Sequence, residues 1–97
     1  MIRVDIIANQ SIEENVIDEL TTLGHGESFS YIHPVYGRGT NGRREGSAVW
    51  PETNVMFVVF LDDGTADALA ERIRTLRRQF PKEGIRCWVS EAPTSEI

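Results

Sequence analysis

The stretch "NVMFVVFLDDGTADALAERIRTLRRQF", residues 54–80, carries the strongest structural signal in the chain. Its first eight residues, 54–61, read as a strand, and those after Asn54 form an unbroken apolar run, which is typical of a strand buried on both faces. Asp62 and Asp63 follow, and aspartates are favoured where a helix begins. Apolar residues then recur at helical spacing up to a proline, which predicts a helix over 66–79. Its predicted buried stripe consists of Leu69, Ile73, Leu76 and Phe80.

The N-terminal third predicts a second pair of a strand and a helix. Apolar and polar residues alternate from residue 2, as in a half-buried strand. Ser11 and Glu14 have the spacing of a capping box, which satisfies free amide groups at the start of a helix. Helical spacing of apolar residues then predicts a helix over 12–23, and Gly24 is placed to end it.

Two more segments read as strands. Residues 28–35 are rich in aromatic and β-branched side chains, and Pro34 within them favours an edge strand. Apolar residues alternate again at 85–89. The resulting order, βαββαβ, predicts an α+β ferredoxin-like split βαβ sandwich: a four-stranded antiparallel sheet with two helices on one face. We expect one domain over residues 1–97, with a long excursion at 37–51 and a short tail at 92–97.

The second face of the sheet is also apolar in this prediction. A two-layer sandwich covers one face of its sheet with helices, yet the run at 54–61 is apolar on both faces. Trp88 adds a large side chain opposite the set of Ile85, Cys87 and Val89. The sequence therefore predicts that a second copy of the chain covers the open face, although a central strand can also be apolar in a monomer.

Composition excludes several classes of protein. The net charge of the 97 residues is -5, which argues against binding duplex nucleic acid, and the glycine motif of RNA-recognition modules is missing before residue 54. The longest apolar run is too short to insert into a membrane. The single cysteine, Cys87, excludes an internal disulfide and fits a reducing cytoplasm.

The excursion at 37–51, "GRGTNGRREGSAVWP", is basic and rich in glycine in an otherwise acidic chain. It contains three arginines and only one acidic residue, Glu45. Glycines let backbone amides approach a ligand, and arginine forks match phosphate or carboxylate, so the excursion is either an anion site or a solvated hairpin loop. Trp50 beside Pro51 is either an anchor for a partner or a plug at the base of the loop.

Catalytic and metal-binding patterns are weak. The two histidines, His25 and His33, and the thiol of Cys87 show no spacing typical of a nucleophilic or metal site. In the predicted strand order, His33 and Cys87 lie on opposite edges of the sheet. The arginines of the second helix read as a solvated face; these are Arg72, Arg74, Arg77 and Arg78. We therefore predict no enzyme and no metal site.

Two stretches of sequence, one leading into the excursion and one leading out of it, match the pattern of a known family. These are "PVYGRGTNG" at 34–42 and "AVWPETNVMFVVF" at 48–60, within the βαββαβ order. Nearly the whole chain resembles the P-II signalling proteins, and most of all their divergent P-II-like branch. On this resemblance, the excursion corresponds to the family's T-loop, Gly37 and Gly39 match the glycines at its base, and Asn41 falls about where the family has a glutamine.

The resemblance implies a homotrimer with its sheets turned inward. Small effectors, usually adenine nucleotides, bind between neighbouring subunits of the family, and the T-loop contacts a regulated target protein. The ligand-binding residues predicted on this basis are Gly37, Arg38, Gly39, Thr40, Asn41, Lys82, Gly84 and Arg86. Those predicted to contact a partner through the loop are Arg43, Arg44 and Trp50.

This chain departs from the family before and after the last strand. The family's phosphate-binding run, T-G-x-x-G-D-G-K, is replaced by "FPKEGIRCWV" at 80–89, where Lys82, Gly84 and Arg86 are partial substitutes. The family's arginine pair beyond the last strand is missing, and the loop lacks the tyrosine of its uridylylation switch. The sequence therefore predicts no definite cofactor. An adenine nucleotide and another anion both stay open as the ligand.

The function predicted from these features is a cytoplasmic, trimeric regulatory protein without catalysis. It would sense a small effector and contact a partner protein through residues 37–51. Two alternatives stay open: a trimer of the CutA type that responds to divalent metals through His25 and His33, and a small dimeric enzyme of ferredoxin-like fold.

Overall fold

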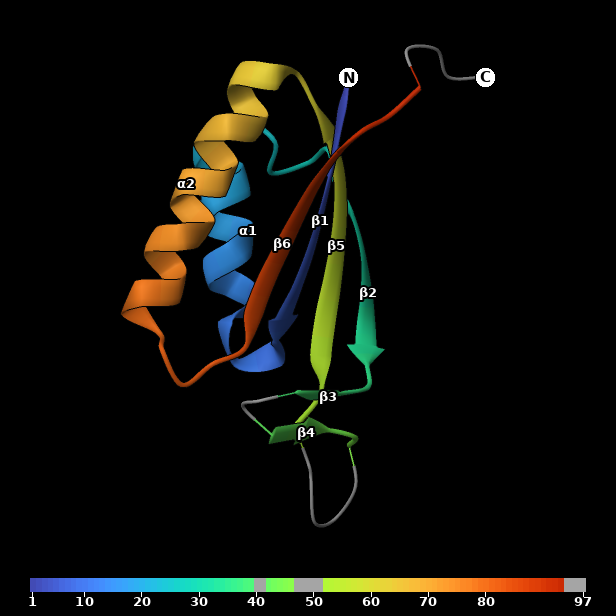
Figure 1. Ribbon diagram of the computed structural model, residues 1–97, viewed down its shortest axis with the longest axis vertical. Coiled ribbons are helices and arrows are strands. Elements are labelled where there is room, and N and C mark those ends of the chain that lie inside the picture. Colours follow the sequence, from blue (N-terminus) through green and yellow to red (C-terminus); the bar gives the residue numbers. More distant parts are fainter. Residues whose placement is uncertain (40–41, 47–51, 94–97) are drawn as a thin grey trace.

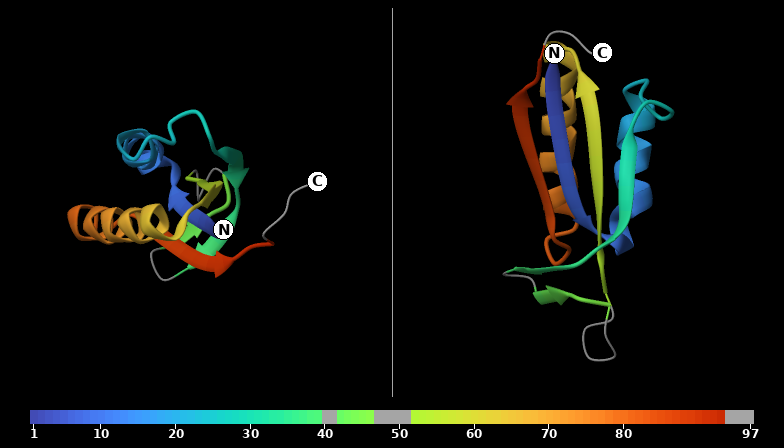
Figure 2. Two further views of the ribbon diagram at one scale, coloured as in Figure 1. Left: turned by 90° about the horizontal axis from the view of Figure 1, so that it is seen from above. Right: turned by 90° about the vertical axis from the view of Figure 1, so that its right-hand side faces the viewer.

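The computed structural model describes residues 1–39, 42–46 and 52–93. Both helices pack on one face of a four-stranded antiparallel sheet, and a two-stranded hairpin lies beyond one end of that sheet (Figures 1 and 2). The elements in chain order are β1 (Ile2–Asn9), the single turn η1 (Gln10–Ile12), α1 (Glu13–Thr22), β2 (Ser30–Val35), β3 (Gly37–Gly39), β4 (Gly42–Arg44), β5 (Asn54–Leu61), α2 (Asp63–Gln79) and β6 (Ile85–Glu91). The predicted ferredoxin-like fold is confirmed.

The strand order of the main sheet is β2-β5-β1-β6. The central strand β1 pairs with β5 and β6, whereas β2 pairs only with β5. Pro34 therefore lies on an edge strand, as predicted, and the register of that strand shifts between Ile32 and Val35. His33 and Cys87 lie on opposite edges, so they do not meet within one chain.

The core lies between the sheet and the two helices. Alternate residues of β1 and β5 point into it, with Ile6 opposite Phe57 and Val4 opposite Val59. The predicted stripe of α2 is buried at Leu69, Ile73 and Leu76. The buried apolar residues contributed by the strands and helices also include Ala8, Ile12, Val16, Leu20, Val55, Leu61, Ala66 and Ile85.

The helix termini differ in part from the sequence prediction. Helix α2 begins at Asp63, three residues earlier than predicted, because the Asp62 side chain accepts a hydrogen bond of 2.7 Å from the Thr65 amide. Ser11 does not cap α1: its amide donates to Asn9, and its hydroxyl donates to Glu83 at 2.8 Å. The positive φ of Gly24, 84°, ends α1 as predicted.

The second face of the sheet is open in the single chain. Burial alternates along β5, so its residues on this side are only partly covered, and Phe60 is 48% exposed. Ile32 on β2 and Trp88 on β6 are 60% and 50% exposed on the same face. The prediction of burial on both sides of β5 thus holds on one side only within one chain. In the described part of the chain, no helix has the length and apolarity needed to span a membrane.

Candidate functional site

The excursion between β2 and β5 begins as a small hairpin. Strands β3 and β4 pair antiparallel, with Arg38 opposite Arg43 and Gly39 opposite Gly42. The sequence predicts a loop here, because three-residue strands of glycine and arginine carry no apolar alternation. The amide of Gly46 donates to the carbonyl of Glu52 at 3.2 Å, which brings the two ends of the segment between them together.

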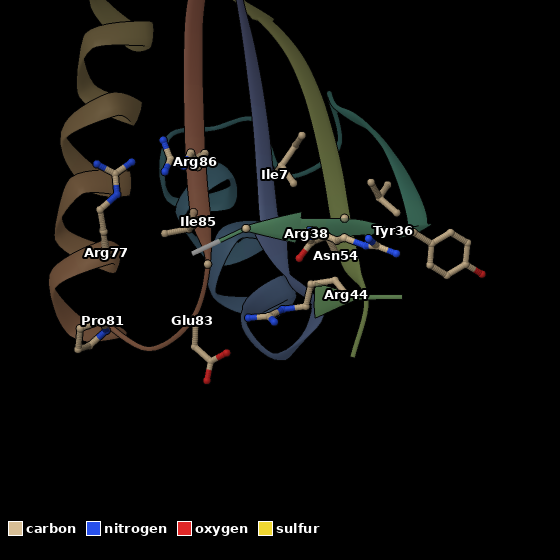
Figure 3. A pocket seen from close by; sticks show the side chains of 14 residues that line it. Ile7, Tyr36, Arg38, Arg44, Asn54, Arg77, Pro81, Glu83, Ile85 and Arg86 are labelled. Carbon is tan, nitrogen blue, oxygen red and sulfur yellow. The ribbon is translucent and has the colours of Figure 1, made fainter. Parts of the chain in front are cut away.

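This hairpin forms one wall of a cavity of about 570 Å³ (Figure 3). The other walls come from the end of α2, the turn after it and the start of β6. The lining residues are Ile7, Val35, Tyr36, Gly37, Arg38, Gly39, Arg44, Asn54, Arg77, Pro81, Glu83, Gly84, Ile85 and Arg86.

The charge of this cavity is strongly positive in an acidic protein. Four arginines line it against one carboxylate, Glu83. Figure 3 shows Arg77 and Arg86 on the side of α2 and β6, and Arg38 and Arg44 on the side of the hairpin. Four guanidinium groups around one cavity suit an anion that carries phosphate or carboxylate groups.

The two pairs of arginines differ in their partners. The Arg38 side chain, which is 67% exposed, pairs with Glu45 next to the hairpin. Arg44 Nε lies 3.6 Å from Glu52 Oε2. Neither Arg77 nor Arg86 has a carboxylate within ion-pair distance among residues 1–39, 42–46 and 52–93. These two guanidinium groups are therefore available to an anion without breaking an ion pair seen here.

Arg44, at the base of the hairpin, belongs to a cluster of polar residues with Glu52 and Asn9. The residue is only 6% exposed, and the carboxylate that it pairs with also accepts a hydrogen bond of 3.2 Å from Asn9 Nδ2. Asn9 is fully buried, and its backbone amide donates to the Gly84 carbonyl at 2.8 Å. The end of β1 therefore joins the hairpin base to the opposite wall of the cavity.

A second polar group lies beside this one. His33 Nε2 is 3.1 Å from Thr53 Oγ1 and 3.3 Å from Gln10 Oε1. These contacts connect the exposed end of β2 with the segments next to β1 and β5. His33 is therefore a hydrogen-bonded residue in this structure.

The structure brings together five of the eight predicted ligand-binding residues. Gly37, Arg38, Gly39, Gly84 and Arg86 all line the cavity, although they come from segments far apart in the chain. The assignment of these residues to a ligand stays a prediction, but their proximity is a fact of the fold.

The remaining predicted residues have different positions. Lys82 is exposed and does not line the cavity. Thr40, Asn41 and Trp50 lie outside the described residues, and so does the choice between anchor and plug at Trp50. Arg43 is described only as part of the β4 backbone. Arg44 was predicted to contact a partner; in the single chain it is 6% exposed and lies beside Glu52, and its role in partner contact stays a prediction.

Sequence reasoning missed the contribution of α2 to the cavity. Arg77 was assigned to a solvated helix face, yet it lines the cavity beside Arg86. The signal was available in the topology, because the last turn of α2 is joined to the start of β6 by a short connection, residues 80–84. Tyr36 and Asn54 were also missed, since they flank the excursion rather than lie within it.

Cys87 and His25 are the remaining nucleophilic and metal-ligating side chains considered in the sequence analysis. Burial raises the pKa of the Cys87 thiol, and the charges of Arg77 and Arg74 oppose this rise. The thiol therefore stays protonated near neutral pH and is a weak nucleophile. His25 lies near Asp62 at the far end of β5, away from His33, and no group of three possible metal ligands occurs among the described residues.

This architecture and cavity define a class: a small ferredoxin-like domain with an arginine-lined cavity under a glycine- and arginine-rich hairpin. The model of the family described as Nitrogen regulatory protein P-II matches residues 1–92, so the chain belongs to the P-II family of regulatory signalling proteins. The resemblance seen in the sequence is thereby confirmed. A search of curated proteins finds no match.

Solved structures of P-II-like proteins share the fold. A nitrogen regulatory PII-like protein, CPII, from Thiomonas intermedia K12, bound to ADP, AMP and bicarbonate, is 17% identical, with a TM-score of 0.72 over 92% of this chain and 82% of that one. A putative PII-like signaling protein from Thermus thermophilus is 20% identical, with a TM-score of 0.66 over 92% and 83%. A DUF3240 family protein from Shewanella baltica is 16% identical, with a TM-score of 0.69 over 99% and 94%.

Proposed function

We propose that the protein is a non-catalytic regulatory trimer of the cytoplasm that senses a small anionic effector in the arginine-lined cavity. It would transmit occupancy to a partner protein through residues 37–51. The observation that carries the proposal is the set of four arginines around one cavity, two of them without an ion-pair partner among the described residues.

The class of effector follows from the chemistry of the cavity. Guanidinium groups bind phosphate and carboxylate oxygens through paired hydrogen bonds. A volume of about 570 Å³ lies within the usual range for small-ligand sites. An adenine nucleotide supplies both the charge and the size, and bicarbonate is a smaller candidate, since both occur in the CPII structure named above.

Trimer formation is supported by the open face of the sheet. Ile32, Phe60 and Trp88 expose large apolar surfaces there, and such surfaces usually mark an interface. With its sheets turned inward, a trimer would cover this face. It would also place the cavity next to a neighbouring subunit, as the family resemblance implies.

The test is a calorimetric titration of the purified protein with ADP, ATP and bicarbonate, together with its mass in solution. The proposal expects saturable binding of at least one of these ligands by a trimer. Pull-down with the full chain and with a variant lacking residues 37–51 then tests the partner role. A protein that binds none of the three ligands and keeps every partner without the loop is not the sensor proposed here.

A further inference from the structure

We propose that Glu52 is a built-in competitor for the anion that the cavity binds, and that it thereby sets the affinity of the site. Its carboxylate lies beside Arg44, which lines the cavity, so an anion entering the cavity would compete with Glu52 for the Arg44 guanidinium. This inference rests on the proposed function, since it assumes that the cavity accepts an anion.

Arg44 and Glu52 differ strongly in their access to water. Glu52 Oε2 lies 3.6 Å from Arg44 Nε, and the Arg44 side chain is 8% exposed whereas that of Glu52 is 50% exposed. A guanidinium with so little access to water needs an anionic neighbour, because desolvated charge is costly. The partly exposed glutamate supplies that charge while it can still move toward solvent.

Glu52 is also held in place by a hydrogen bond from Asn9. Asn9 Nδ2 donates a hydrogen bond of 3.2 Å to the same oxygen, Oε2, and Asn9 is fully buried. Buried side-chain amides keep a fixed position when their other hydrogen bonds are satisfied, and Asn9 Oδ1 accepts from the Ser11 amide at 3.0 Å. Glu52 therefore has a defined position beside Arg44 rather than a loose surface contact.

Hydrogen bonds connect this pair to the rest of the cavity. The Asn9 amide donates to the carbonyl of Gly84, and the Ser11 hydroxyl donates to Glu83. Gly84 and Glu83 line the wall opposite the hairpin, and Arg44 belongs to the hairpin. An anion that takes Arg44 from Glu52 would change the hydrogen bonding of Asn9, which touches both walls.

The prediction is that neutralising Glu52 tightens anion binding. The Glu52→Gln variant keeps the size of the side chain and an oxygen for Asn9, but it no longer balances the charge of Arg44. We expect ADP to bind about fivefold more tightly, as for loss of one partly exposed ion pair from the free state. The matched control is Glu71→Gln, because Glu71 pairs with Arg74 on the solvated side of α2, outside the cavity lining.

A double-mutant cycle shows whether Glu52 acts through Arg44. Calorimetric titration with ADP is carried out on the wild type, Glu52→Gln, Arg44→Gln and the double variant, and bicarbonate and inorganic phosphate are titrated in the same series. The inference expects the gain from Glu52→Gln to vanish when Arg44 is already glutamine. Equal or weaker binding by Glu52→Gln, or a gain that persists without Arg44, overturns it.

These outcomes separate the two proposals. If the wild type binds ADP and Glu52→Gln changes nothing, the cavity is an anion site and only the role of Glu52 is wrong. If no variant binds any of the three anions, both proposals fail. The wild type also gives a direct reading without substitution: ADP should shift the NMR signals of the Asn9 side-chain amide, and unchanged signals on saturation contradict the inference.

Discussion

Gly46 lies against the ring of Tyr36: a β-carbon added at Gly46 would be 3.1 Å from Tyr36 Cε1 and 3.2 Å from Thr53 Cγ2. Gly46 also has a positive φ of 65°, which side chains other than glycine rarely adopt. The base of the hairpin therefore depends on a glycine at this position for two reasons, backbone conformation and close packing.

The first prediction follows from this contact. Gly46→Ala should destabilise the protein by about 1–3 kcal/mol, since it adds a strained backbone angle and forces Tyr36 to move. Gly39→Ala is the control, because Gly39 has no positive φ and no atom within 4 Å of an added β-carbon. Chemical denaturation measures both variants. Equal stability of Gly46→Ala and wild type would show that the base of the hairpin is not held as described.

The second prediction concerns the start of α2. Hydrogen bonds from the Thr65 backbone and side chain lower the pKa of Asp62 below its ordinary value. The folded state then binds this proton more weakly than the unfolded state, so the stabilisation is complete above the ordinary pKa and is lost as the pH falls through the folded pKa. Asp62→Asn keeps a good cap without a charge. Its thermal midpoint should therefore fall less between about pH 5 and about pH 3 than that of the wild type.

Much of the fold was predictable because local patterns agreed with it. The apolar run predicted the strand at 54–61. Capping chemistry predicted that α1 ends before Gly24, which has a positive φ. Helix α2 begins three residues before its predicted start. Asp63 and Gly64 are weak helix formers, but they are helical here because Asp62 caps the helix before them. The capping box predicted at Ser11 was wrong, because the side chain that accepts a backbone hydrogen bond here is Asn9, and its donor is the Ser11 amide.

The site was only partly predictable, because it depends on tertiary contacts. Glycine and arginine content marked the excursion, and the family resemblance placed Gly84 and Arg86 among the ligand-binding residues, which the fold brings next to the hairpin. Nothing local distinguishes Arg77 from its neighbours on α2. Glu52, beside Arg44, accepts a hydrogen bond from Asn9, which lies 43 positions away in the sequence. A contact between such distant residues produces no periodic pattern from which it could be predicted.

The third prediction tests the arginines outside the hairpin. Arg77→Gln and Arg86→Gln should each weaken ADP binding about tenfold, which is typical of losing one charge-assisted hydrogen bond. Arg78→Gln is the matched control, since Arg78 lies next to Arg77 on α2 but does not line the cavity. Calorimetry measures the affinities. If Arg78→Gln weakens binding as much as Arg77→Gln, the effect is one of overall charge and the cavity is not the site.

The fourth prediction concerns the open face of the sheet. Phe60 is 48% exposed there, opposite Arg3 in the sheet register, so Phe60→Glu places a carboxylate near a guanidinium and should leave the fold of one chain intact. In an assembly the same carboxylate would lie in an apolar interface and oppose association. We therefore expect a mass near 10.9 kDa, that of one chain, in place of the mass of the proposed trimer.

Val89→Glu provides the control for this experiment. Val89 is 49% exposed, almost the same as Phe60, but it pairs with Val4 and so belongs to the face that the helices cover. Both variants add the same charge to an exposed apolar position. Light scattering with size-exclusion chromatography should find Val89→Glu still associated and Phe60→Glu monomeric. If Phe60→Glu keeps the wild-type mass, the subunits associate through a different surface and the open face requires another partner.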